Sequence, residues 1–162
     1  MSIFLEGINP NIANRNGFIY ALIGSPGSGK SSLLLSLFRS KNYYKNKFNH
    51  IYLITPESSF LSVKDHPFQD HSKVYHELTS QVLENIYNEL VEIKKECLEN
   101  NYEVEHACVI IDDFGSELKG NKLIRALKHL LIIKSRHIGC SLSLRFNVII
   151  YFHWLYGSYS QI

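Results

Sequence analysis

A glycine-rich loop directly behind an apolar run is the feature that most restricts the fold of this chain. The apolar run reads GFIYALI over residues 17–23, and the loop reads GSPGSGKSS over residues 24–32. The loop fits the pattern G-x-x-x-x-G-K-[ST], which needs a strand before it and a helix after it. The stretch SSLLLSLFR over residues 31–39 has the composition of that helix. The sequence therefore predicts a strand, a loop and a helix in succession.

The same loop has the composition that a phosphate group needs around it. Glycine adopts positive φ and has no Cβ, so successive backbone N–H groups can form a nest around an anion. The helix that follows directs the positive end of its dipole at the same anion. We expect Lys30 to reach the β- and γ-phosphates of a nucleotide and the Ser31 hydroxyl to ligate Mg²⁺. The residues expected to contact the nucleotide are Gly24, Ser25, Pro26, Gly27, Ser28, Gly29, Lys30, Ser31 and Ser32.

The overall composition indicates one folded domain. At 162 residues, with 45% hydrophobic and 20% charged residues, the chain is long enough to bury a sizeable core. The net charge of +2 gives no argument for a nucleic-acid partner and does not exclude one. Three widely spaced cysteines favour a reducing compartment over a disulfide framework. We expect no signal peptide and no membrane-spanning segment, because the apolar runs are too short.

A second informative stretch reads ACVIIDDF over residues 107–114. Its apolar residues indicate a buried strand that ends in two carboxylates, and ligands of parallel sheets lie at the carboxyl ends of strands. We assign Asp112 to the Mg²⁺ shell and Asp113 to the orientation of the attacking water. The alternative for Asp113 is that it caps the following turn.

Strand-like and helical patterns alternate along the chain, which predicts a parallel sheet covered on both faces. Residues 58–76 have little periodicity and are expected to form a loop or an irregular crossover. A solvated loop is the favoured interpretation of the basic stretch KNYYKNK, and a nucleic-acid contact is the alternative. Further strands are expected at residues 50–55 and 141–152, and helices at residues 78–98 and 121–135.

In this order, the segments resemble the genome-packaging ATPases of poxviruses, virophages and other large eukaryotic DNA viruses, within the FtsK/HerA-like branch of P-loop motors. The resemblance implies a P-loop NTPase of the α/β class, a RecA-like three-layer sandwich with a mainly parallel central sheet. It covers residues 14 to about 144. The matching segments are NRNGFIYALIGSPGSGKSSLLLSLF, YYKNKFNHIYLITPESS, HPFQDH with HELTSQVLENIYNELVEIKK, VIIDDFGSELK and LIRALKHLLIIKSRHIGCSLSL.

The resemblance also implies an activity. Members of this family form rings that hydrolyse ATP with Mg²⁺ and push double-stranded DNA into a preformed capsid. By this resemblance, Lys30 and Ser31 would bind the phosphates and the metal, and Asp112 and Asp113 would be the paired acids. The resemblance also makes Arg136 a candidate arginine finger for a neighbouring subunit. The alternative for Arg136 is a cation that complements a helix dipole.

The partners and location follow from the same resemblance. The expected partners are double-stranded DNA, further copies in a homo-oligomeric ring, and a portal or vertex protein of the capsid, with no membrane. The expected location is the host cytoplasm, in viral factories, or the virion.

The family's next strand normally ends in a polar sensor, usually Gln, beside the γ-phosphate. Here the corresponding stretch reads SLSLRFN, with Arg145 and Asn147 but no Gln; only if this C-terminus is genuine is Asn147 or Arg145 the expected substitute. We therefore expect a lead-in over residues 1–16, the ATPase domain over residues 17–144 and an atypical tail over residues 145–162. Truncation or a shift in reading frame is the expected origin of that tail.

The residues alone leave two other functions open. A nucleotide or small-molecule kinase also begins with a P-loop, although the five arginines of this chain do not cluster. A subunit that binds ATP at an interface without efficient turnover is the non-enzymatic alternative. A GTPase would show the motif N-K-x-D, and NKLI over residues 121–124 lacks the aspartate.

Overall fold

The computed structural model describes residues 19–23, 27–64, 66–69, 72–103, 105–114, 121–128 and 146–152. Within them, five parallel strands form one sheet in the order β1-β5-β4-β2-β3. The strands are β1 (Ile19–Ile23), β2 (His50–Ile54), β3 (Ser72–Tyr75), β4 (Ala107–Ile111) and β5 (Phe146–Phe152). The helices are α1 (Lys30–Arg39), α2 (Glu57–Leu61), α3 (Ser80–Glu99) and α4 (Asn121–Lys128).

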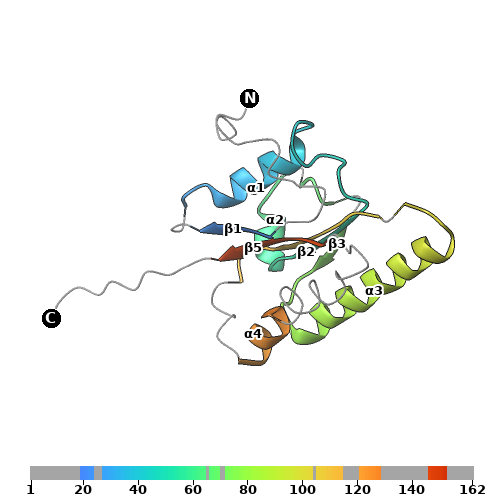
Figure 1. Ribbon diagram of the computed structural model, residues 1–162. Helices are drawn as coiled ribbons and strands as arrows, with labels where there is room; N and C mark the ends of the chain where they lie inside the picture. The colour runs from blue at the N-terminus through green and yellow to red at the C-terminus, as the bar shows by residue number, and fades with distance from the viewer. Residues whose placement is uncertain are drawn as a thin grey trace.

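Helices cover both faces of the sheet, with α1 on one side and α3 and α4 on the other (Figure 1). Successive side chains of a strand point to opposite faces, so each central strand contributes to both cores. Tyr52 and Ile54 of β2 pack in the core with α3 and α4, whereas Leu53 packs in the core with α1. Val109 and Ile110 of β4 divide in the same way. This arrangement confirms the predicted α/β fold, a RecA-like three-layer sandwich around a parallel sheet.

Strand β5 lies between β1 and β4, so the strand before the glycine-rich loop does not pair with the strand before the acidic pair. Ile23 is in register with Phe152, and Ile111 with Ile150, so all three strands end at the same edge. The sheet therefore extends beyond residue 144, where we expected the ATPase domain to end. The run VIIYF explains this, because apolar, β-branched residues are typical of the central strands of parallel sheets.

The prediction of a loop over residues 58–76 is wrong in part. Helix α2 and strand β3 lie within or at the border of this stretch, and β3 pairs in parallel with β2. The sequence of β3, SKVY, mixes polar and apolar residues over only four positions. Short strands at the edge of a sheet give such weak patterns, because only one side of the strand has a partner.

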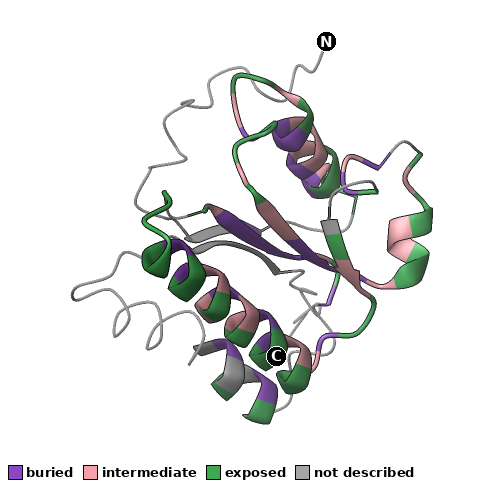
Figure 2. Cartoon of the chain, turned by 90° about the vertical axis from the view of Figure 1, so that its right-hand side faces the viewer, coloured by how far each residue is buried: buried purple, intermediate pink, exposed green. Residues whose placement is uncertain are grey.

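Helix α3 confirms the amphipathic helix predicted over residues 78–98. Its buried residues face the sheet, and its exposed residues face outward (Figure 2). The N-cap is Thr79, whose Oγ1 accepts a hydrogen bond from the Val82 N–H at 3.1 Å. Of the helix predicted over residues 121–135, α4 accounts for the first eight residues, and the others lie outside the described residues.

The basic stretch KNYYKNK forms turns after α1, and its three lysines are exposed. Tyr44 is different, because it is 2% exposed and packs against Phe38 and Phe48 with ring centroids 5.3 and 5.9 Å apart. This tyrosine anchors the turn to the core, so its ring is not presented for stacking on a base. No helix within the described ranges is both long and apolar enough to cross a lipid bilayer.

Candidate nucleotide-binding site

The described part of the glycine-rich loop leads into α1 through two glycines with positive φ. The φ angles are 74° at Gly27 and 82° at Gly29, which is the N-cap of α1. Residues with a Cβ disfavour this left-handed region. A Cβ at Gly27 would meet no atom of the described residues within 4 Å, so backbone conformation rather than crowding favours glycine there.

Lys30 is the first residue of α1 and is only 7% exposed. Its Nζ donates a hydrogen bond to Ser28 Oγ at 3.3 Å, so the side chain folds back over the loop. Ser31 and Ser32 follow in the first helical turn and are exposed. The start of α1 thus brings together a cation, hydroxyl groups and the positive end of a helix dipole, an arrangement that can bind phosphate.

Asp112 follows β4 directly, and its backbone N–H donates a hydrogen bond to the Ile54 carbonyl at 2.9 Å. Burial and the neighbouring charge of Asp113 raise the pKa of Asp112 to about 6, although the Lys30 charge acts in the opposite direction. Oδ1 of Asp112 is buried and has no hydrogen-bond partner among the described residues. A buried carboxylate oxygen without a partner is costly in a folded protein, and a bound cation would satisfy it.

Asp113 has a different environment from its neighbour. It is exposed, its φ is 62°, and its Oδ2 accepts a hydrogen bond from Ser59 Oγ at 2.7 Å. Aspartate is one of the few residues with a side chain that adopts the left-handed region routinely. The alternative that Asp113 caps the following turn involves residues 115–120, which lie outside the described residues.

One cavity of about 150 Å³ connects α1 with the acidic pair. Ser31 lines it from α1, and Asp112 and Asp113 line it from the end of β4. The structure therefore brings together three of the side chains that the sequence assigned to metal binding and water activation. The other polar lining residues are Thr55, Ser59, Ser62 and His66.

These four lining residues were missed in the sequence. A signal existed for Thr55 and Ser59, because the polar stretch TPESS follows β2, and β2 pairs with β4. The carboxyl ends of adjacent parallel strands lie at one edge of a sheet, where ligands bind. No local signal existed for His66, which lies between Phe60 and Phe68 with ring centroids 4.5 and 5.2 Å away.

The remaining predicted site residues belong to the first half of the loop, the candidate arginine finger and the candidate sensor. Gly24, Ser25, Pro26 and Arg136 lie outside the described residues, as does Arg145. Asn147 is described, and the register of β5 contradicts its prediction as the γ-phosphate sensor. It is level with Cys108, the second residue of β4, which lies four residues, or about 13 Å, before Asp112.

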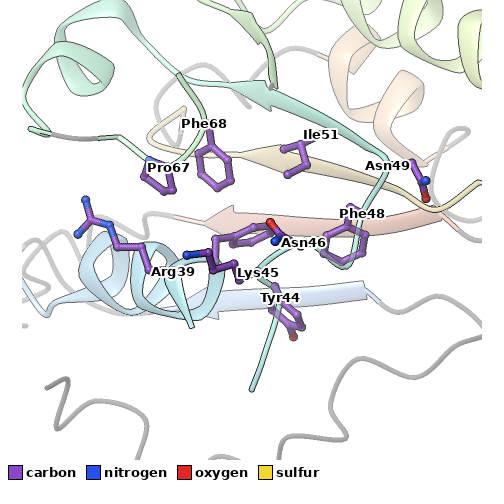
Figure 3. A pocket seen from close by; sticks show the side chains of 10 residues that line it. Arg39, Tyr44, Lys45, Asn46, Phe48, Asn49, Ile51, Pro67 and Phe68 are labelled. Atoms are coloured by element: carbon purple, nitrogen blue, oxygen red, sulfur yellow. The ribbon is translucent and has the colours of Figure 1, made fainter. Parts of the chain in front are cut away.

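A larger cavity of about 750 Å³ lies at the opposite end of α1 (Figure 3). Arg39, the last residue of α1, lines it together with Ile51 near the start of β2. Aromatic rings, among them Tyr44, Phe48 and Phe68, form much of the rest of its wall. This cavity lies at the end of α1 that is away from Lys30 and near the start of β2, whereas Asp112 lies at the carboxyl edge of the sheet. The larger of the two cavities is therefore not the site of the predicted chemistry.

A parallel α/β sandwich with this loop at the start of α1 and an acidic pair at the end of β4 defines the class, a P-loop ATPase. The fold is similar to a solved structure described as the pCW3 conjugation coupling protein TcpA, monomer form with ATPγS, with a TM-score of 0.50 at 16% sequence identity. The similarity covers 85% of this chain and 43% of that chain, and it shows the fold alone. None of the curated proteins is significantly similar in sequence.

The family profile described as Poxvirus A32 protein matches residues 9–153. The chain therefore belongs to the poxvirus A32 protein family, which confirms the resemblance to viral packaging ATPases. The match includes β5, so the expectation that family-like sequence ends at about residue 144 was wrong. The reason is that Arg145 and Asn147 interrupt the apolar pattern in the sequence, whereas β5 begins at Phe146 and continues through Asn147 to Phe152.

Proposed function

We propose that this chain is a motor subunit that binds and hydrolyses ATP at the carboxyl edge of the sheet and translocates double-stranded DNA into a viral capsid. The observation that carries the proposal is the cavity shared by Ser31, Asp112 and Asp113 beside the buried Lys30. Membership of the poxvirus A32 family supports the DNA-packaging role.

The nucleotide would be held by the loop and the first turn of α1. Lys30 would contact the β- and γ-phosphates, because its ammonium group already lies against the loop, where it donates a hydrogen bond to Ser28 Oγ. Backbone N–H groups of the loop would surround the phosphates, which explains the positive φ angles of Gly27 and Gly29. The complete proposed set is Gly24, Ser25, Pro26, Gly27, Ser28, Gly29, Lys30, Ser31 and Ser32.

Asp112 and Ser31 would hold Mg²⁺. Their side chains line the same cavity, and Oδ1 of Asp112 lacks any other partner among the described residues, so this donor set fits a hard cation with oxygen ligands. When bound, Mg²⁺ would neutralise charge on the phosphate oxygens. Asp113, exposed at the mouth of the same cavity, would orient the attacking water.

The proposed motor also requires other protein chains, namely further copies of itself and a capsid protein. Arg136 would complete the site of a neighbouring subunit in a homo-oligomeric ring, and stabilise charge that develops in the transition state. A portal or vertex protein would hold the ring on the capsid, in the viral factory of the host cytoplasm or in the virion.

The experiment is ATP hydrolysis by the purified chain, with and without double-stranded DNA, at several salt concentrations. The proposal predicts that DNA raises the rate, and that this stimulation falls steeply with salt because DNA contacts are mainly to phosphates. DNA-independent transfer of phosphate to a small molecule would favour a kinase instead. ATP binding without turnover under all conditions would favour a passive nucleotide-binding subunit.

A further inference from the structure

Helix α2 contributes a side chain to the acidic pair although it belongs to neither the glycine-rich loop nor the acidic strand. Ser59 Oγ donates a hydrogen bond to Asp113 Oδ2 at 2.7 Å, across 54 positions of the sequence. Both residues line the cavity that Ser31 and Asp112 share.

This hydrogen bond fixes a group that would otherwise rotate. Asp113 is exposed, and the χ2 torsion of aspartate is broad, so the carboxylate has many orientations of similar energy. A hydroxyl donor at 2.7 Å selects one of them, because hydrogen bonds to ionised carboxylates are among the stronger ones in proteins. One oxygen of Asp113 is then occupied, and the other is the one that would orient a water.

Ser59 is itself held firmly. Its carbonyl accepts a hydrogen bond from Ser62 Oγ at 2.7 Å, and the next residue, Phe60, packs on His66 with ring centroids 4.5 Å apart. His66 in turn packs on Phe68, which is 1% exposed. The position of the Ser59 hydroxyl therefore depends on the core beneath α2 rather than on a loose surface turn.

The cavity next to this hydrogen bond has unsatisfied polar groups. Nδ1 of His66 and Oδ1 of Asp112 are both buried without a hydrogen-bond partner among the described residues. Their residues line the same cavity as Ser59, and its volume is large enough for several water molecules. Such a polar, roomy cavity is a suitable place for ordered water beside Asp113.

From these contacts we infer that Ser59 is a positioning residue for ATP hydrolysis: it holds the Asp113 carboxylate in the orientation that directs the attacking water. This inference rests on the proposed function, because it assigns a role within the same reaction. Ser59 acts through Asp113, which the proposal assigns to the water rather than to the phosphates, so its loss is expected to change turnover and not nucleotide affinity.

The test compares Ser59→Ala, Ser59→Thr and the matched control Ser58→Ala, an exposed serine on the same helix. Ser59→Ala is expected to lower kcat about tenfold, with the ATP affinity and KM unchanged, since a hydrogen bond to a charged group is lost. Ser59→Thr retains a hydroxyl and is expected to keep most of the kcat. Ser58→Ala is expected to hydrolyse ATP at the rate of the unmodified chain.

A double variant separates positioning from general damage to α2. Ser59→Ala added to Asp113→Asn is expected to cause no further loss of kcat, because two residues that act as one unit are not additive. An unchanged kcat in Ser59→Ala, or an equal further loss in the Asp113→Asn background, would overturn the role of Ser59 alone. The proposed function is tested separately by comparing the unmodified chain with Lys30→Ala. If the unmodified chain does not hydrolyse ATP, or if its hydrolysis does not depend on Lys30, the proposed function is overturned, and the role of Ser59 with it.

Discussion

Adjacent carboxylates at the end of β4 have different surroundings, and this difference predicts a division of labour. Asp112 is largely buried, and its Oδ1 has no hydrogen-bond partner in the described part of the chain, whereas Asp113 is exposed and accepts a hydrogen bond from Ser59. Asp112→Asn should weaken Mg²⁺-dependent ATP binding, because the amide is a poorer ligand for a hard cation. Asp113→Asn should leave ATP binding intact and slow hydrolysis. Titration of ATP affinity with and without Mg²⁺, together with kcat, measures both effects, and wild-type turnover in Asp113→Asn would mean that the base lies elsewhere.

The raised pKa of Asp112 also predicts a pH dependence of stability without nucleotide or metal. Its pKa is about 6 in the folded chain, against an ordinary value of 3.8, so the folded state binds the proton more tightly. The contribution of Asp112 to the free energy of unfolding therefore falls as pH rises from about 4 to 6. Asp112→Asn should remove this dependence. The free energy of unfolding of the variant minus that of the wild type should therefore be larger at pH 7.5 than at pH 5, by on the order of 1 kcal/mol. Urea unfolding in EDTA at the two pH values tests this, and equal differences at both would contradict it.

At the scale of single elements, the N-cap of α3 is the clearest local stabiliser. The Thr79 hydroxyl satisfies the Val82 N–H, one of the N–H groups that a helix leaves without an internal partner. Thr79→Ala should lower the free energy of unfolding by about 1 kcal/mol, while Thr79→Ser should retain most of it. Urea unfolding measures this, and a Thr79→Ala variant as stable as the unmodified chain would show that water replaces the cap.

Elements with strong patterns could be predicted from the sequence, and those defined by long-range contacts could not. Residues 31–39 and 78–98 have clear helical composition or spacing, and α1 and α3 match them within two residues at each end. The insertion of β5 between β1 and β4 has no local signal, since strand order depends on pairing between distant segments. The site divides similarly: the motif indicates Lys30 and Ser31, while the contact of Ser59 with Asp113 arises only when α2 folds over the end of β4.

At the scale of the whole assembly, the proposed role of Arg136 predicts complementation between defective subunits. Lys30→Ala removes a chain's own phosphate contact, and Arg136→Ala removes the finger that it would offer to a neighbour. Each variant alone should hydrolyse ATP poorly. A mixture should regain part of the activity, because some interfaces would pair an intact loop with an intact finger. Rates measured before and after mixing test this, and a mixture no faster than its components would show that Arg136 does not act between subunits.

The central claim is that ATP binds and reacts at the glycine-rich loop, and Lys30→Ala tests it most directly. Lys30 is buried beside the loop hydroxyl of Ser28, and its loss removes a charge-assisted contact to phosphate. The account predicts a folded protein that loses about 2–4 kcal/mol of ATP binding or transition-state stabilisation. Lys95→Ala is the matched control, since Lys95 is exposed on α3 and its Nζ lies 3.9 Å from Glu99 Oε1 in a surface ion pair. ATP affinity and kcat both unchanged in a folded Lys30→Ala protein would contradict the assignment of this loop as the nucleotide site.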